Sequence, residues 1–141
     1  MTDHPMRGFG RAFRDAFAAN DAERVAAYLD DQIDWTVFGP VDLFPLFGHR
    51  RGKQAVLEML REATPRISLN GSDTERTLVD GDHAATMLRV SVRDLRSHRI
   101  LVLRLALFAQ FTDGKLITLR AVFDSFDAAE QALGRHIDIS R

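Results

Sequence analysis

Residues 100–120 read ILVLRLALFAQFTDGKLITLR and identify the second half of the chain as β-sheet. The residues on one side of this stretch are apolar at every second position, which is the period of a β-strand. The Asp113-Gly114 pair interrupts the apolar pattern and is a strong signal for a two-residue hairpin turn. The sequence therefore predicts two long antiparallel strands, over 98–112 and 115–126.

Both faces of the first of these strands are apolar. Its opposite row contains only two polar residues, Arg104 and Gln110. A strand that is apolar on both faces is covered on both faces, and the helices of one small domain can cover only one of them. We therefore expect the second face to pack against another copy of the chain, as a homodimer formed sheet to sheet, with Arg104 and Arg120 on the interface side. The first row contains Leu101, Leu103, Leu105, Leu107 and Phe111.

The first half of the chain is predicted to be mainly helical. Phe9, Phe13 and Phe17 recur at intervals of four residues, which is typical of an amphipathic helix. Helices followed by antiparallel strands indicate an α+β fold, in which N-terminal helices cover one face of a curved sheet. The other predicted elements are a helix over 22–29, a strand over 33–38, a helix that begins at Gly52, strands over 66–70, 74–80 and 83–94, and a short helix that follows Asp127.

Length and composition exclude several classes of function. The 141 residues fit a single domain, 1–141, and the absence of cysteine rules out disulfides and cysteine-ligated metals. Nineteen Lys and Arg are balanced by 20 Asp and Glu, so we expect no nucleic-acid partner. No histidine pair has the spacing of a zinc site, and we expect neither a metal nor another cofactor. The chain lacks a signal-peptide core and an apolar run long enough for a bilayer, which predicts a cytoplasmic protein with no membrane contact.

Several short blocks follow one another along the chain: YLDD at 28–31 with IDW at 33–35, GHRRGKQAV at 48–56, DGKLI at 113–117 and VFD at 122–124. In this order and spacing, they resemble the SnoaL-like proteins of the nuclear-transport-factor-two superfamily, which includes ketosteroid isomerase and limonene epoxide hydrolase. The resemblance covers about residues 9–134. It implies a cone-shaped α+β fold with an apolar pocket between the curved sheet and the helices, and a dimer.

The catalytic residues of the two named enzymes carry over poorly. At the positions that match ketosteroid isomerase, the general base is replaced by Thr36, the helix tyrosine by Phe13 and the oxyanion-binding Asp by Leu107. Against limonene epoxide hydrolase only the arginine, Arg89, is retained. The resemblance therefore implies the fold and the pocket, and neither of these two reactions. The remaining positions that match the epoxide hydrolase set are Asp34 for its tyrosine, Thr36 for its asparagine, and Ser91 and Ala121 for its two aspartates.

The same correspondences place Asp34 and Arg89 in the pocket. One hypothesis makes Asp34 a general base and Arg89 the group that orients a substrate carbonyl or stabilises an enolate. The alternative is a structural ion pair, because an unpaired buried charge is costly. His49 is either a proton donor at the pocket mouth or a solvated loop residue. The residues expected to contact a ligand are Phe13, Thr36, Phe38, Phe44, His49, Ser91, Leu107 and Phe123.

Asp124 is a further candidate, because SnoaL-like proteins use an acidic residue near this position as acid or base. Strict alternation puts Asp124 on the face opposite Phe123, away from the pocket, unless a bulge reverses it. The sequence thus predicts an isomerase, cyclase or hydratase that acts on a small apolar carbonyl compound without a cofactor. The alternative is a non-catalytic ligand-binding domain or dimeric interaction module of the same fold.

Overall fold

The computed structural model describes residues 4–39 and 46–124. Two predictions lie outside these residues: the contact expected from Phe44 and the short helix after Asp127. The elements, in chain order, are α1 (Pro5–Ala19), the 3-10 helix η1 (Ala22–Tyr28), β1 (Leu29–Phe38), β2 (Gly48–Arg51), α2 (Lys53–Ala63), β3 (Ile67–Asp80), β4 (His83–Asp94), β5 (Ile100–Thr112) and β6 (Lys115–Phe123).

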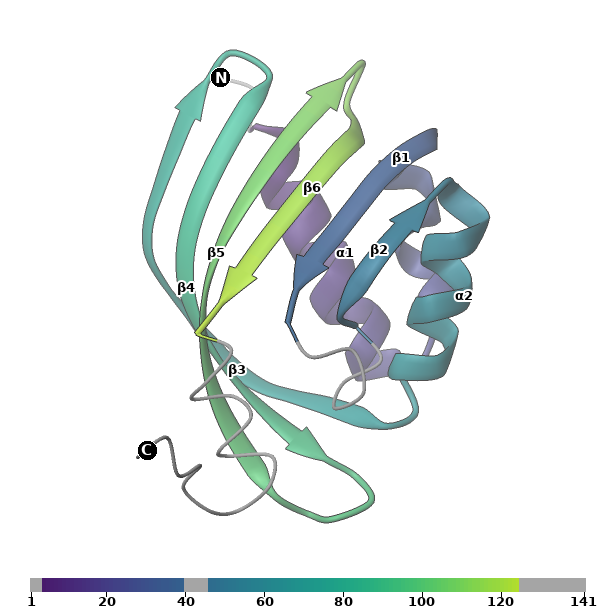
Figure 1. Cartoon of the computed structure of the whole chain (residues 1–141), viewed down its shortest axis with the longest axis vertical. Helices are drawn as coiled ribbons and strands as arrows, with labels where there is room; N and C mark the ends of the chain where they lie inside the picture. The colour runs from purple at the N-terminus through teal and green to yellow at the C-terminus, as the bar shows by residue number, and fades with distance from the viewer. Residues whose placement is uncertain (1–3, 40–45, 125–141) are drawn as a thin grey trace, which may run out of the picture.

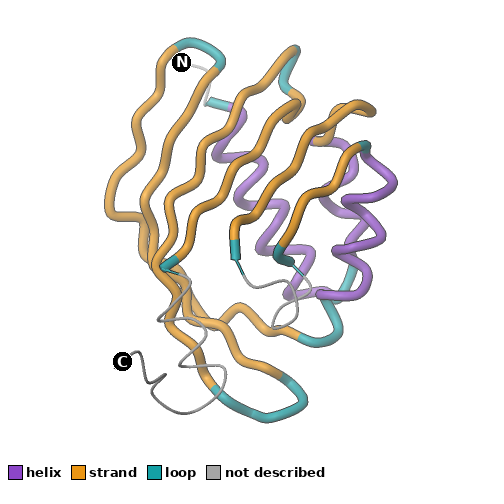
Figure 2. Tube along the Cα trace, in the orientation of Figure 1, coloured by secondary structure: helices purple, strands orange, loops and turns teal. Residues whose placement is uncertain are grey.

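The six strands form one curved, unclosed sheet in the order β2-β1-β6-β5-β4-β3 (Figure 1). β1 and β6 are parallel, and every other pair is antiparallel. Helix α1 lies behind the sheet in Figure 1, and α2 lies beside β2 (Figure 2). We call the side that α1 covers the inner face and the opposite side the outer face. The predicted α+β architecture, with N-terminal helices on one face of a curved mixed sheet, is confirmed.

Helix α1 attaches to the inner face through its aromatic side chains. Its N-terminus is capped by His4, whose ring accepts a hydrogen bond from the Met6 N–H, and Pro5 follows at a position where a missing N–H costs nothing. The Phe9 and Phe13 rings lie 6.2 and 6.4 Å from the Trp35 ring on β1. The spacing of four residues therefore brings one stripe of the helix onto the sheet, as the sequence predicts.

The core lies between the helices and the inner face. On β5 the buried residues alternate with exposed ones, so that Phe111 is 1% exposed whereas Phe108 is 51% exposed. The two rows predicted for this strand are thus confirmed, and the helices cover the leucine row. The buried sheet residues on this face include Ile33, Trp35, Val37, Leu101, Leu103, Leu119 and Ala121.

Two parts of the sheet differ from the prediction. The segments expected as two short strands form the single strand β3, whose ladder is interrupted by irregularities at Leu69/Gly71 and Thr74/Arg76. These irregularities disturb the alternation in the sequence, so that one long strand resembles two. β2 was not predicted at all: its four residues, Gly-His-Arg-Arg, carry no apolar alternation and pair with only β1 at the sheet edge.

Candidate functional site

The outer face of β1 carries the side chains that were expected in the pocket. Ile33, Trp35 and Val37 are buried on the inner face, so Asp34 and Thr36 point to the other side, with Phe38, which is exposed. The expectation that these three residues line a pocket under the helices is therefore wrong. The residues had been matched to positions of ketosteroid isomerase and limonene epoxide hydrolase. An error of one residue in that matching exchanges the two faces of a β-strand.

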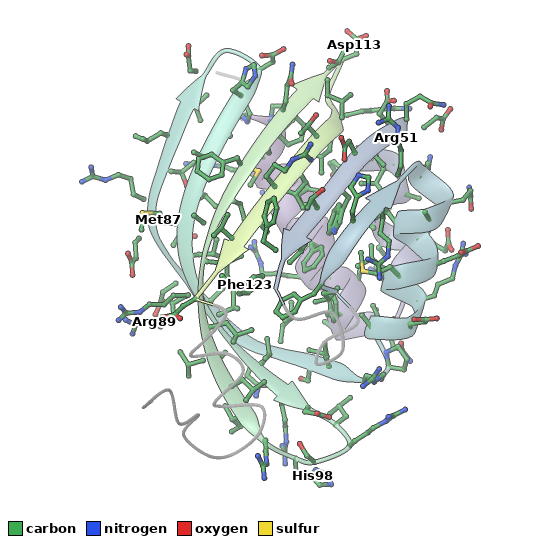
Figure 3. All side chains as sticks on the ribbon, in the orientation of Figure 1. Arg51, Met87, Arg89, His98, Asp113 and Phe123 are labelled. Carbon is green, nitrogen blue, oxygen red and sulfur yellow. The ribbon has the colours of Figure 1, made fainter. Side chains whose placement is uncertain are left out.

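Arg89 and Ser91 also lie on the outer face. They pair across the β4–β5 ladder with Arg104 and Val102, in the row opposite the buried leucines. Arg89 is exposed and projects away from the sheet in Figure 3. The predicted pairing of Asp34 with Arg89 does not form, because β6 and β5 separate β1 from β4.

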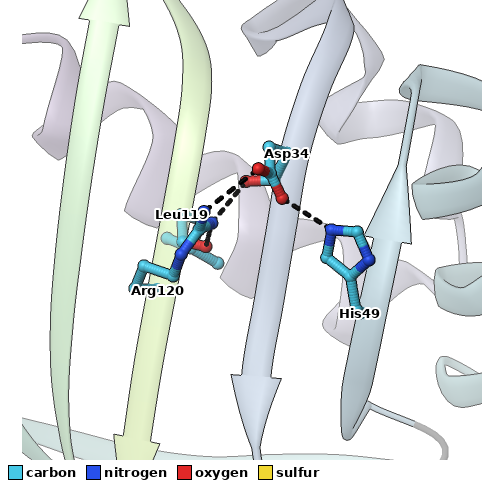
Figure 4. Close-up of polar contacts among 4 residues, drawn as sticks. All are labelled: Asp34, His49, Leu119 and Arg120. Atoms are coloured by element: carbon cyan, nitrogen blue, oxygen red, sulfur yellow. Dashed lines mark hydrogen bonds and ion pairs between the residues drawn. The ribbon is translucent and has the colours of Figure 1, made fainter.

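Asp34 instead joins two other residues of the outer face (Figure 4). The Arg120 Nη2 donates to Asp34 Oδ2 at 3.0 Å, and Arg120 Nη1 donates to the Asp34 backbone oxygen at 3.1 Å. His49 Nε2 lies 2.8 Å from Asp34 Oδ1. The three residues come from β1, β6 and β2, and we call them the Asp34 triad. Asp34 and His49 were both predicted site residues. Their contact was not predicted, because it depends on strand β2.

The contacts of the triad keep Asp34 ionised. The hydrogen bonds from His49 and Arg120 lower the pKa of its carboxyl group below the ordinary value of 3.8, against the opposing effect of partial burial. An ionised carboxylate only accepts hydrogen bonds, so Nε2 of His49 carries the proton in this contact. The side chains of His49, Arg120 and Asp34 are 55%, 35% and 25% exposed, so water reaches all three.

Asp34→Asn is expected to flatten the dependence of stability on acidic pH. The folded-state pKa of Asp34 is lowered, so its stabilising contribution is complete above 3.8 and is lost as the pH falls from there through the folded-state pKa. At neutral pH the substitution should cost about 1 kcal/mol, the upper end for ion pairs that water reaches. Urea denaturation over a series of pH values measures this. Asp113→Asn in the β5–β6 turn is the control, because Asn tolerates the same left-handed turn conformation. Equal pH dependence in wild type and Asp34→Asn would contradict the expectation.

The inner face contains a different polar group, the indole nitrogen of Trp35. The side chain is 3% exposed, and among the described residues its Nε1 has no hydrogen-bond partner. It belongs to the Trp35 cluster of four aromatic rings, in which Phe9 and Phe13 contact each other and Trp35, and Phe17 contacts Phe13. Leaving a buried donor unsatisfied costs about 1–3 kcal/mol, which an acceptor on a bound molecule would remove. Trp35 was not among the predicted site residues. The signal was its place in a predicted core strand, because a buried tryptophan usually has a hydrogen-bond partner for its N–H.

Three of the predicted ligand contacts lie on the inner side. Phe13, Leu107 and Phe123 pack against the core but are only partly buried, so the apolar surface near them is incompletely covered within the described residues. The Phe123 ring lies 5.2 Å from that of Phe47, which precedes β2 (Figure 3 labels Phe123). Trp35 also stands directly opposite Arg50 in the β1–β2 ladder.

The remaining candidates lie away from this face. His49 is exposed in the Asp34 triad on the outer face rather than at a pocket mouth. Asp124 follows the end of β6, is exposed, and donates its backbone N–H to the Arg104 carbonyl at 3.3 Å. The ladder of β6 has no irregularity near Phe123, so no bulge turns Asp124 towards the inner face.

The described part of the chain contains neither a cluster of metal-binding side chains nor a helix that could span a membrane. In residues 4–39 and 46–124, no group of three or more His, Asp or Glu side chains is placed to hold a metal ion. None of the helices in the same part of the chain is long and apolar enough to cross a bilayer.

Comparison with known proteins places the chain in a family. The SnoaL-like domain profile matches residues 10–119. A structure from Rhodopseudomonas palustris, named "Putative Isomerase", is 42% identical, with a TM-score of 0.91 over 96% of this chain and 100% of that one. An NTF2-like protein from Burkholderia xenovorans is 17% identical (TM-score 0.74; 94% and 98% covered). An LEH-like epoxide hydrolase from M. tuberculosis is 21% identical (TM-score 0.72; 93% and 90% covered). No curated protein matches. The chain therefore belongs to the SnoaL-like family and has the NTF2-like fold.

Proposed function

We propose that the protein binds a small apolar carbonyl compound on the inner face of the sheet, between Trp35 and the partly covered Phe13, Leu107 and Phe123. The observation that carries the proposal is the buried Trp35 Nε1, which lacks a hydrogen-bond partner among the described residues. A ligand carbonyl that accepts from this N–H satisfies the donor, and the ligand's apolar body then contacts Phe13, Leu107 and Phe123. Pockets of this composition, apolar with a few fixed polar groups, are typical of small-molecule sites.

Ligand binding can be followed by the fluorescence of Trp35, because it is the only tryptophan of the chain. A matched ligand pair, 4-phenylbutan-2-one and butylbenzene, differs mainly in the carbonyl oxygen. The ketone is expected to quench Trp35 fluorescence and to bind about fivefold to tenfold more tightly than the hydrocarbon, as one hydrogen bond of about 1 kcal/mol implies. Trp35→Phe lacks this fluorescence, so its ligand binding is measured by calorimetry. The substitution should abolish the preference for the ketone and leave hydrocarbon binding unchanged. Failure of a broad set of small ketones to bind the wild type would overturn the proposal.

Isomerisation of the bound carbonyl compound is a second candidate, favoured by the 42% identity with the Rhodopseudomonas protein. A donor at the carbonyl oxygen stabilises the enolate that forms when a solvent molecule takes a proton from the neighbouring carbon, and the solvent then returns a proton, or a deuteron in D2O. The Asp34 triad does not supply the base for this step, because it lies on the opposite face of the sheet from Trp35. Proton NMR in D2O tests the candidate: the wild type should exchange the ketone's α-protons faster than Trp35→Phe. Equal exchange in both would limit the function to binding.

The outer face serves, in this proposal, as the contact surface with a second copy of the chain. Large contiguous apolar patches on a protein surface mark interaction sites. A shallow groove of about 280 Å³ runs beside Phe108 between Leu78 and Arg120 and offers a seat for apolar side chains of the second copy. The large apolar residues exposed on this face are Phe38, Leu78, Met87, Ile100, Val102, Phe108 and Val122.

A further inference from the structure

Arg50 lies on the inner face of the sheet, a position that could not be predicted because strand β2 was not predicted. It lies in β2 directly opposite Trp35, in an antiparallel pair whose side chains share the inner face. Opposed Cβ atoms in such pairs are about 5 Å apart. The neighbours His49 and Arg51 point to the outer face, where His49 contacts Asp34. Of the two adjacent arginines of β2, only Arg50 stands beside the proposed ligand site.

The guanidinium of Arg50 is held at the edge of the core. The side chain is partly buried, and Nη1 donates to the backbone oxygen of Phe47 at 3.0 Å. Phe47 in turn packs its ring 5.2 Å from that of Phe123, one of the proposed ligand contacts. The hydrogen bond to the Phe47 carbonyl fixes the orientation of a planar group whose N–H donors match the two oxygens of a carboxylate.

We propose that Arg50 determines the specificity of this site, and that the ligand is a small apolar 2-oxo acid. Its ketone oxygen accepts from Trp35 Nε1 and its carboxylate binds the Arg50 guanidinium. Trp35 and Arg50 are paired in the β1–β2 ladder and share its inner face, which suits a ligand whose ketone and carboxylate are close together; a 2-oxo acid has them on adjacent carbons. This inference rests on the proposed function and adds the charge of the ligand to it.

The test compares 2-oxo-4-phenylbutanoate with 4-phenylbutan-2-one, in which a methyl group replaces the carboxylate. The wild type should bind the oxo acid roughly tenfold to a hundredfold more tightly, as a charge-assisted hydrogen-bonded pair implies. Arg50→Gln should remove that preference and keep the affinity for the ketone. Arg50→Lys should retain part of the preference, because it keeps the charge without the planar fork. Arg51→Gln, the neighbour on the outer face, should behave as wild type.

The outcomes separate this inference from the proposed function. Two results would overturn the role of Arg50 while ketone binding stands. In the first, the wild type binds the ketone and binds the oxo acid no more tightly. In the second, Arg50→Gln weakens the binding of both ligands equally. If neither ligand binds the wild type, the proposed function fails as well. Should Arg50→Gln not fold, as judged by circular dichroism, Arg50→Lys and added salt decide the case: a preference that neither of them lowers contradicts the proposal.

Discussion

Val122→Glu is expected to convert the proposed dimer, of twice the 15.9 kDa chain mass, into a monomer. Val122 lies on the outer face, 47% exposed, between Phe38 of β1 and Ala106 of β5 in the sheet ladder. A carboxylate at this position would lose its water in a sheet-to-sheet interface. Its direct ladder neighbours are apolar, and an ion pair with Arg104 or Arg120, the neighbouring arginines on the same face, would not repay the full cost of that desolvation. The effective cost of taking a charge out of water is several kcal/mol, enough to weaken the proposed interface strongly.

Light scattering coupled to gel filtration measures the mass of both forms. Gln54→Glu on helix α2 adds the same charge at an exposed position away from the outer face, and it should remain dimeric. Circular dichroism shows whether Val122→Glu keeps its fold. A folded Val122→Glu that is still dimeric would move the interface elsewhere. A wild type that is monomeric at micromolar concentration would leave the exposed apolar row without the proposed partner.

The sequence predicted the rows of β5 correctly because the pattern there is unambiguous. Leucines occupy every second position, and the Asp113-Gly114 turn fixes where the strand ends; Asp113 and Gly114 both adopt the positive φ angles that such a turn requires. On β1 the rows were assigned by correspondence with other proteins, and a shift of one position reversed both faces. Trp35, a large apolar residue between two polar ones, was the local signal that would have given the correct face.

The partners of Asp34 could not be predicted from the sequence, because they depend on which strands are neighbours in the sheet. Arg120 lies 86 residues away and meets Asp34 only because β1 and β6 pair in parallel, a contact that no local pattern specifies. His49 is brought to Asp34 by β2, a four-residue edge strand without apolar alternation. The predicted partner was Arg89, on the assumption that both residues face a pocket; the actual partner follows from the strand order, which places β6 beside β1.

Phe111→Ala is expected to lower the free energy of unfolding by about 3–5 kcal/mol, the usual cost of removing a buried phenylalanine ring. Its ring is 1% exposed and contacts His4, whose side chain caps helix α1. Phe108→Ala on the same strand is the matched comparison, because Phe108 is 51% exposed on the outer face.

The two substitutions are best compared by urea denaturation in the Val122→Glu background, where the proposed interface no longer contributes. There Phe108→Ala removes contacts with water rather than with a core, and we expect it to cost less than about 1 kcal/mol. In the wild-type background, where the proposed interface is intact, Phe108→Ala should lower the midpoint of unfolding by more than it does in Val122→Glu, because there it also weakens association. Equal costs for the two substitutions in the monomer would mean that both faces of β5 are packed within one chain, which would contradict both the one-sided core and the sheet-to-sheet dimer.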